Sequence, residues 1–297
     1  MNLNRFQLEN LSPPAELLNA VIQQITSHAS VRSYRPDPLP PGALEVLVTA
    51  AQSASTSSNL QTYSIIAIED AERRRLFAEL TRNAHVADAP LFLVFCPDLH
   101  RLEVVCQRQG HPFADRYMDM FLQAVVDAAL AAQNAAIAAE SMGLGICMIG
   151  GIRNNVPKVA EVLRLPPRTF ALVGMTVGYP ATPPKIRHRL PLDVILHREV
   201  YSDDNLEEGL RRYDEVTAQS GIYAGRQVAV PSGATQATGA GDAGAKGRAQ
   251  GAPGEGGRQR QDPALYGWCE HSARRMARLN PDRAKLRQQL EMLGWEF

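Results

Sequence analysis

The sequence has no surplus of charge, because 31 lysines and arginines are balanced by 31 aspartates and glutamates over 297 residues. We therefore expect no general field that attracts nucleic acid or an anionic membrane, and specific pockets must do any anion binding. The proportions of hydrophobic (45%) and charged (21%) residues are those of an ordinary globular protein. The length allows one or two domains and a sizeable core.

Long uninterrupted apolar segments and closely spaced cysteines are also missing. The first 30 residues contain no basic segment followed by an apolar core, so we expect no secretory signal. Polar side chains interrupt the most apolar stretch, residues 120–142, and argue against a membrane span: Gln123, Asp127, Gln133, Asn134 and Glu140. The four cysteines are scattered, with no Cys-x-x-Cys and no histidine at metal-ligand spacing. They could pair, but we favour reduced thiols in a cytoplasmic protein without a metal site.

Residues 231–264 lack any large aliphatic, aromatic, methionine or cysteine side chain. Such a segment has nothing to bury and cannot offset the entropy lost on ordering. We predict a flexible Gly/Ala-rich insertion over residues 231–263, within a single domain formed by residues 1–230 and 264–297. Its charges are too sparse for a nucleic-acid-binding arm.

Familiar nucleotide and catalytic motifs are absent as well. Met148 stands where a Gly-x-Gly-x-x-Gly motif beginning at Gly143 has its third glycine, and no Gly-Lys-Ser/Thr loop occurs. A Rossmann or phosphate-loop site is therefore excluded. No Ser/His/Asp set or pair of carboxylates stands out as a catalytic unit.

What is present is an alternation of short apolar runs with longer segments of helical periodicity. The runs predict strands at residues 63–68, 91–95, 146–149 and 171–178. The helical patterns cover residues 14–26, 41–53, 70–81, 115–141, 156–164, 205–218, 265–279 and 282–293. Pro41 suits a first helical position, and Asn155 suits a helix cap. The alternation predicts an α+β fold (α/β layered), with helices packed on a sheet.

Two segments are dense in polar groups: residues 27–34 (Ser-His-Ala-Ser-Val-Arg-Ser-Tyr) and residues 54–61 (Ala-Ser-Thr-Ser-Ser-Asn-Leu-Gln). Both lie beside segments patterned for burial, where an unpaired donor or acceptor costs about 1–3 kcal/mol. A phosphorylated ligand with many acceptors would provide the partners.

These segments, together with residues 143–155 (Gly-Leu-Gly-Ile-Cys-Met-Ile-Gly-Gly-Ile-Arg-Asn-Asn), resemble the FMN-dependent nitroreductase superfamily. The likeness is to its NADPH-preferring branch of NADPH nitroreductases and NADPH:flavin oxidoreductases, and it extends over residues 15–226 and 264–297. It implies a nitroreductase-like fold with a central mixed, mainly antiparallel sheet flanked by helices. It also implies a domain-entwined homodimer, to which the alanine-rich helix at 120–141 contributes; on periodicity alone, that helix could equally be the centre of the monomer core.

The resemblance implies that His28 and Ser30 contact the FMN phosphate, and that Arg32 lies beside the pyrimidine edge of the ring. Ala29 departs from the arginine common in this branch, which would remove one phosphate contact. Without the resemblance, His28 reads as a helix cap and Arg32 as a solvated charge. A cation beside the ring would stabilise the anionic reduced flavin.

Further FMN contacts implied by the resemblance come from four other segments: Ser55, Ser57, Gln61, Asn83, Ile149, Gly150, Gly151, Arg187 and Arg189. The serines read alone as a turn or cap. Glycines at 150 and 151 allow close approach of a planar ring, or simply form a tight turn. Arg187 and Arg189 have the spacing that places two side chains on one side of an extended strand, although an exposed basic loop fits equally well.

For NADPH, the resemblance implies a 2′-phosphate contact at Arg226, with Arg153, Arg274 and Arg275 adding to the site, although all four could be surface cations. We predict a cytoplasmic homodimer that oxidises NADPH and reduces small planar acceptors such as nitroaromatics, quinones or free flavin, by ping-pong hydride transfer. The chemistry would occur at the flavin itself. A reductive dehalogenase, a flavin-modifying enzyme or a flavin-binding protein without substantial turnover are the alternatives.

Overall fold

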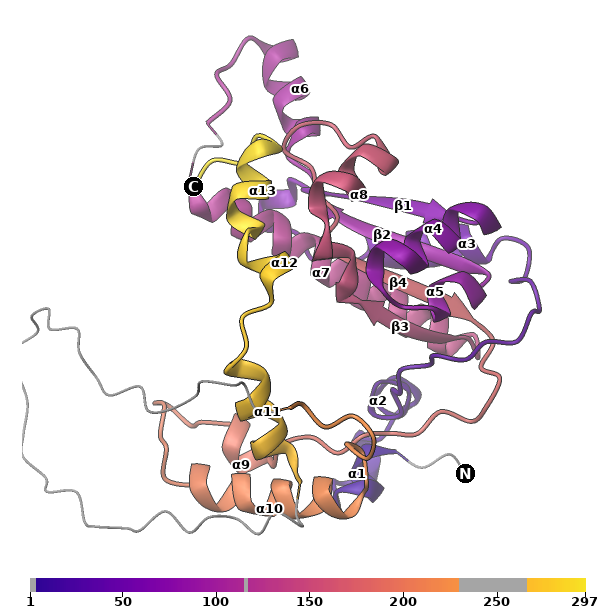
Figure 1. The fold of residues 1–297 in the computed structure, drawn as a ribbon, viewed down its shortest axis with the longest axis vertical. Helices are drawn as coiled ribbons and strands as arrows, with labels where there is room; N and C mark the ends of the chain where they lie inside the picture. The colour runs from indigo at the N-terminus through magenta and orange to yellow at the C-terminus, as the bar shows by residue number, and fades with distance from the viewer. Residues whose placement is uncertain (1–3, 115–116, 230–265) are drawn as a thin grey trace, which may run out of the picture. The chain divides into compact units, whose positions relative to one another are not determined.

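The computed structural model describes residues 4–114, 117–229 and 266–297 (Figure 1). The chain forms two compact units, Met1–Arg187 with Asn280–Phe297, and His188–Leu279. Each unit is described here by itself. The single domain formed by residues 1–230 and 264–297 stays a prediction, and the predicted insertion at 231–263 lies outside the described residues.

The first unit is built on a sheet with strand order β1-β2-β4-β3. Its strands come from the four predicted runs: β1 (Tyr63–Ile68), β2 (Leu91–Pro97), β3 (Gly145–Ile149) and β4 (Val173–Gly178). All three strand pairings in this sheet are antiparallel. The expected sheet was mixed and mainly antiparallel, and the four described strands contain no parallel pair. β2 is buried along its whole length because it lies inside the sheet with helices on both faces.

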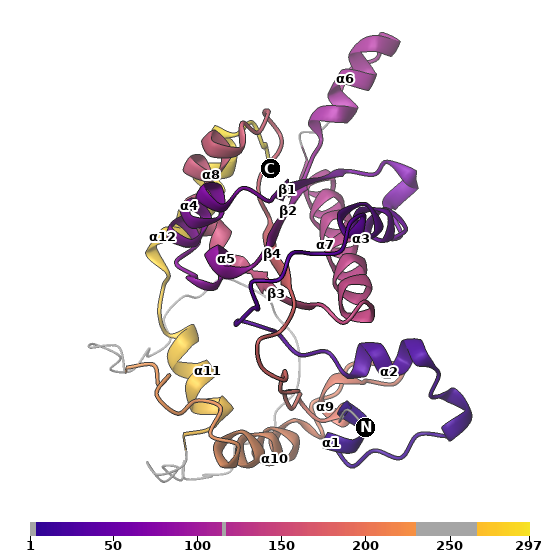
Figure 2. The same cartoon turned by 90° about the vertical axis from the view of Figure 1, so that its right-hand side faces the viewer.

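Side chains of β2 alternate between two cores, which makes the unit three-layered. Leu91, Leu93 and Phe95 pack with α3 (Ala43–Gln52) and α7 (Met118–Ser141). Phe92, Val94 and Cys96 pack on the other face with side chains of α4 (Ala71–Thr81) and α8 (Val156–Leu163). Figure 2 shows the sheet between these two helical layers. The predicted layered α+β fold is thus confirmed.

Several helix boundaries differ from the sequence pattern. The segment at 14–26 divides into η1 (Ala15–Leu17) and α2 (Ala20–Thr26), because the Asn19 side chain accepts from the Ile22 N–H and starts a new helix. Residues 282–293 likewise divide into α12 (Pro281–Ala284) and α13 (Leu286–Met292). Pro41 precedes α3, whose first residue follows Gly42 at a φ of 81°. The cap of α8 by Asn155, which accepts from the Lys158 N–H, is confirmed.

The remaining elements are short or carry few buried side chains. In the first unit they are α1 (Arg5–Leu8), η2 (Ser57–Asn59), α5 (His85–Asp88), α6 (His100–Gln109) and η3 (Gly150–Asn154). The second unit contains α9 (Leu192–Ile195), α10 (Leu206–Gln219) and α11 (Trp268–Met276). The sequence pattern did not predict α1, α5, α6 or α9.

α7 has the length and composition of a membrane-spanning helix, a property that it shares with buried core helices. Its alanine face forms part of the core against α3 and the sheet. A second face carries exposed apolar side chains at every fourth position: Met118, Leu122, Val126 and Leu130. We call these four residues the α7 stripe.

The four cysteines carry free thiols, as predicted. Burial raises the pKa of Cys96 and Cys147, which keeps both protonated at neutral pH.

Candidate functional site

Residues 29–32 lie alongside β3 and contribute one cation to the candidate site. Val31 lies alongside β3, where its N–H donates to the Ile146 carbonyl at 2.8 Å. Burial alternates along the segment, because Ala29 and Val31 are buried whereas Ser30 and Arg32 are exposed. Ser30 and Arg32 are therefore available to a ligand, and Ala29 is not.

Arg32 makes no hydrogen bond or ion pair with any residue that the structure describes. Its charge nevertheless affects the pKa of His85 at the start of α5. Burial, and then the Arg32 charge, lower the pKa of His85 below its usual value, so this imidazole is neutral at neutral pH. The His85 Nε2 atom is buried and has no hydrogen-bond partner. The Arg32 guanidinium and the His85 Nε2 atom are thus two polar groups without a partner among the described residues.

One ring nitrogen of His28 already has a partner within the protein. Its Nδ1 atom lies 2.5 Å from Glu140 Oε1 in the last turn of α7, so that atom is already occupied. Glu140 and Ala29 line a cavity of about 720 Å³. The sequence predicted that His28 contacts a phosphate. In the structure its Nδ1 atom contacts Glu140 instead, and only Nε2 is left for a ligand.

The turn after β3 places Gly151 against the end of α4. A Cβ atom at Gly151 would stand 2.3 Å from the Thr81 carbonyl oxygen and 2.6 Å from Asn83 Nδ2. The Asn83 amide donates to the same carbonyl at 2.6 Å. Gly151 is thus required by packing on α4, whereas the sequence suggested approach of a ring. The structure does bring Asn83, Gly150 and Gly151 together.

This packing predicts opposite tolerances at the two glycines. Gly151→Ala is expected to lower the free energy of unfolding by about 1–3 kcal/mol, because the added methyl overlaps backbone that cannot easily move. Gly150→Ala is the matched control, since its Cβ would meet side-chain atoms of Arg153 and Arg283 at 3.4 Å or more and no backbone. Urea unfolding of the two variants without ligand measures the difference. Equal losses would contradict the packing described here.

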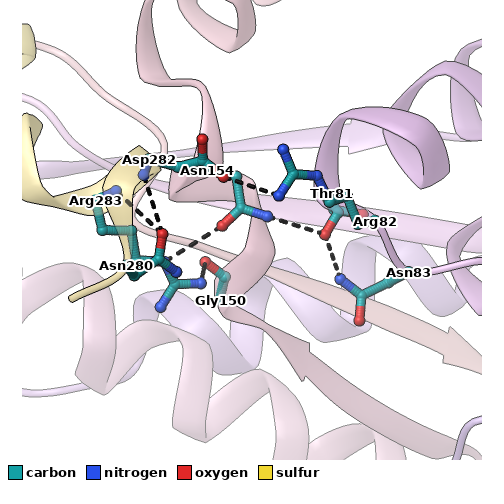
Figure 3. Close-up of polar contacts among 8 residues, drawn as sticks. All are labelled: Thr81, Arg82, Asn83, Gly150, Asn154, Asn280, Asp282 and Arg283. Carbon is teal, nitrogen blue, oxygen red and sulfur yellow. Dashed lines mark hydrogen bonds and ion pairs between the residues drawn. The ribbon is translucent and has the colours of Figure 1, made fainter. Parts of the chain in front are cut away.

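The C-terminal segment fixes the same turn from its other side (Figure 3). Arg283 Nη2 donates to the Gly150 carbonyl at 2.8 Å, and Arg283 Nε donates to Asn154 Oδ1 at 3.3 Å. Asn154 Nδ2 in turn donates to the Thr81 carbonyl at 3.3 Å. Asn280 caps α12 and so orients the first turn that carries Arg283. Sequence reasoning missed Arg283, because no motif marks a contact 133 residues away.

Arg153, in the same turn, is a second cation without an acidic partner among the described residues. It donates to the Leu172 carbonyl. Burial, and then the nearby Arg283 charge, lower the pKa of Arg153 below its usual value. Ile149, the last residue of β3, has its side chain in the core, so only its backbone is available to a ligand.

The second polar segment lies at the opposite edge of the sheet. Ser55, Ser57 and Gln61 are exposed just before β1. Residues 55–57 line a groove of about 450 Å³ with α7, including three residues of the α7 stripe: Leu122, Val126 and Leu130. β1 and β3 are the two outer strands, so three strand spacings, at least roughly 14 Å, separate Gln61 from Gly150. One chain therefore places these predicted FMN contacts at two opposite edges of its sheet.

Arg187 and Arg189 do not lie on a strand, contrary to the geometry that their spacing allowed. Arg187 ends the first unit, and its carbonyl accepts from Arg5 Nη1 at 3.0 Å. Arg189 belongs to the second unit and donates to the His188 carbonyl at 3.2 Å. Their predicted convergence on a phosphate stays a prediction.

The second unit holds three of the four arginines predicted for NADPH. Arg226 and Arg275 are exposed, and neither side chain has a hydrogen bond or ion pair with a described residue. Arg274 is already engaged, because it pairs with Glu270 at 2.5 Å and donates to the Val228 carbonyl at 3.0 Å. Arg226 and Arg275 are thus better placed than Arg274 to bind an anion.

An aromatic cluster adjoins these arginines. His271 stacks on Tyr223 with ring centroids 4.1 Å apart, and its Nδ1 lies 3.2 Å from the Tyr266 hydroxyl. Burial, and then the Arg275 charge, lower the pKa of His271. Arg275 therefore lies close to a flat, neutral surface.

The chain is similar to several known proteins. The sequence model of the nitroreductase family matches residues 25–179. The FMN reductase (NADPH) of Bacillus subtilis is 41% identical over 203 residues, which cover 67% of this chain and 82% of the relative. The oxygen-insensitive NADPH nitroreductase of Salmonella typhimurium is 39% identical over 203 residues, covering 68% and 82%. The solved structure of B. megaterium NfrA2 has a TM-score of 0.77 at 28% identity, covering 94% of this chain and 99% of that one.

Proposed function

Because this chain belongs to the nitroreductase family, we propose that it is an FMN-dependent oxidoreductase that takes electrons from NADPH. Its acceptors are small planar molecules: nitroaromatics, quinones or free flavin. The observation in the structure that carries the proposal is Arg32, an exposed guanidinium alongside β3 without a partner among the described residues. Such a guanidinium is available for a charge-assisted hydrogen bond to an anionic ligand.

The residues present fit FMN, whose phosphate is a dianion and whose ring becomes anionic on reduction. Arg32, Arg153 and Arg283 have no acidic partner among the described residues, so their charges are not cancelled within the chain. The buried, unpartnered His85 Nε2 offers one further polar contact. When bound, FMN accepts hydride at its N5 atom and passes electrons to an acceptor.

We assign each predicted contact according to the access that the structure gives it. Arg32 takes the pyrimidine edge, where its charge stabilises the reduced ring. Gly150 and Gly151 lie along the ring through their backbone, and Asn83 contacts it beside them. Further contacts come from Ile149 through its backbone, from His28 through Nε2, and from Ser30 and Arg187 at the phosphate.

We propose that the enzyme is a homodimer in which the α7 stripe is buried. Val126 in the middle of the stripe is 53% exposed in the single chain, and an apolar row of this length on a core helix is typical of an interface. The adjoining groove holds Ser55 and Ser57, which precede β1, the outer strand opposite to the one that leads into their own chain's Gly150. In the dimer these serines and Gln61 complete the site of the partner subunit.

A charge in the α7 stripe tests the homodimer. Val126→Arg is expected to convert the protein to monomers and to lower its FMN content, because the interface and the shared contacts are lost together. Leu76→Arg is the control, since Leu76 is also exposed but lies on α4, across the sheet. Sedimentation equilibrium decides: a Val126→Arg protein that keeps the wild-type mass would count against this interface.

The second unit accounts for a preference for NADPH over NADH. Arg226 and Arg275 supply positive charge for the 2′-phosphate, since neither has a partner among the described residues. Burial, and then the Arg275 charge, lower the pKa of His271, whose ring stacks on Tyr223. Arg274 supports this region through Glu270 and the Val228 carbonyl rather than through the ligand.

The free thiols support a reducing compartment, and we place the enzyme in the cytoplasm. Its function is tested by loading the FMN-free protein with FMN and assaying it with NADPH and a quinone or nitroarene. We expect one FMN per chain and turnover with both kinds of acceptor. A protein that takes up no FMN would overturn the proposal, and FMN binding without turnover would support a flavin-binding protein instead.

A further inference from the structure

A buried aspartate in α7 holds the loop that carries Ser55, Ser57 and Gln61. Asp127 is 2% exposed, and its carboxylate accepts hydrogen bonds from both ends of this loop. At one end the donors are the Thr56 hydroxyl, at 2.6 Å, and the Ser57 N–H, at 3.2 Å. At the other end Thr62 donates through its N–H, at 3.0 Å, and its hydroxyl, at 2.9 Å.

The loop also closes on itself through one of these groups. The Thr56 hydroxyl donates to Asp127 and accepts from the Gln61 N–H at 2.9 Å. Thr56 and Thr62 therefore turn inward, and the side chains of Ser55, Ser57 and Gln61 are left exposed. The carboxylate thus determines which loop side chains face outward.

Asp127 has no cationic partner among the described residues. A buried carboxylate without a counter-ion is costly, and here only hydrogen bonds from the loop compensate for its desolvation. An amide or an apolar side chain at this position would avoid the free-energy cost of burying a charge in α7. The carboxylate is therefore explained by the loop that it binds rather than by the stability of α7.

The loop backbone needs such support. Three of its non-glycine residues have positive φ: Ser58 at 50°, Asn59 at 55° and Gln61 at 53°. Each such residue is disfavoured outside its native context, and a cluster of them persists only where surrounding contacts fix the chain. Strained segments of this kind gather at ligand sites.

We propose that Asp127 is a positioning residue of the flavin site, which fixes residues 56–62 so that Ser55, Ser57 and Gln61 meet FMN in a set geometry. The inference rests on the proposed function, because FMN is the ligand that these three exposed side chains are proposed to contact. Asp127 itself does not touch the ligand. It acts through Thr56 and Thr62.

The test is Asp127→Asn, which keeps the side-chain size but replaces one acceptor oxygen with a donor that opposes the loop's own donors. Hydrogen exchange of the FMN-free protein is expected to be about tenfold faster or more at the amides of Ser57, Gln61 and Thr62. The dissociation constant for FMN is expected to rise about tenfold or more, and the visible circular dichroism of bound FMN is expected to change.

Asn134→Ala is the matched control on the same helix. Asn134 donates to the Ala50 carbonyl at 3.2 Å, so its removal costs α7 a polar contact away from the loop. Exchange in residues 56–62 and affinity for FMN should stay at wild-type levels. If Asp127→Asn fails to fold, the pair Thr56→Val and Thr56→Ser replaces it: valine should reproduce the loop opening, and serine should restore the wild type.

The outcomes separate this inference from the proposed function. A wild-type protein that does not bind FMN overturns the function and the positioning role together, whatever the loop does. If the wild type binds FMN, unchanged affinity and unchanged dichroism in Asp127→Asn overturn the positioning role alone. Faster exchange with wild-type affinity overturns it as well, because the carboxylate would then be purely structural.

Discussion

Replacing Arg32 with alanine is expected to weaken FMN binding by about 10- to 100-fold, because a charge-assisted hydrogen bond contributes about 1.5–3 kcal/mol. The reduction potential of the bound flavin is expected to fall, since the anionic reduced ring loses a nearby cation. Titration of the FMN-free protein, followed by flavin fluorescence, measures the affinity. A dye-coupled redox titration measures the potential.

Arg35→Ala is the control for this substitution. Arg35 lies three residues further on, is paired with Asp37 at 3.2 Å and stacks over the Tyr179 ring, so it is already engaged. Affinity for FMN should stay within about twofold of wild type in this variant. Equal losses in Arg32→Ala and Arg35→Ala would indicate a general effect of surface charge and count against a specific contact.

Replacing Arg226 with alanine is expected to lower kcat/KM for NADPH by about 10- to 100-fold and to leave NADH within about twofold. The two nucleotides differ only in the 2′-phosphate, which is the group assigned to this guanidinium. Steady-state kinetics with each nucleotide and a fixed quinone give the ratio directly. Arg275→Ala should shift the ratio in the same direction.

Arg211→Ala serves as the control in the same unit. The Arg211 side chain on α10 is held by Glu208 and Glu215, at 2.6 and 2.5 Å, so it has no free charge to offer a phosphate. Its removal should leave the ratio of NADPH to NADH unchanged. An Arg226→Ala enzyme that loses NADPH and NADH equally would exclude the 2′-phosphate role.

The sheet could be predicted from the sequence because each strand is a short apolar run between polar segments. β2 shows why: its side chains are buried on both faces, so its sequence is apolar throughout. α6 was missed for the opposite reason. None of its residues is buried, so its sequence lacks the apolar periodicity that marks a packed helix.

Local capping decided the other helix boundaries. Asn19 looked like an interior residue of a helix at 14–26, yet its side chain accepts from the Ile22 N–H and begins α2. An asparagine followed by apolar residues fits both interpretations. The choice depends on whether the chain turns before it, which periodicity does not report.

Part of the candidate site followed from sequence motifs, and part required the fold. Arg32, Gly150 and Gly151 stand in recognisable motifs, and the structure places Arg32 and the glycine turn beside the same outer strand. Asp127 seemed only to interrupt an apolar helix, although its position within the buried row of Ala124, Ala128 and Ala131 is a signal of a partnered carboxylate. Arg283 gave no signal, because its contact with Gly150 depends on how the C-terminal segment returns to the first unit.

The most direct test of the function is an anaerobic titration of the FMN-loaded protein, recorded in the visible range. The flavin band should bleach on addition of NADPH, more slowly with NADH, and return when a quinone or nitroarene is added after the nucleotide has been removed. That sequence of two separate half-reactions is the result that our account predicts. A flavin band that NADPH leaves unchanged would contradict it.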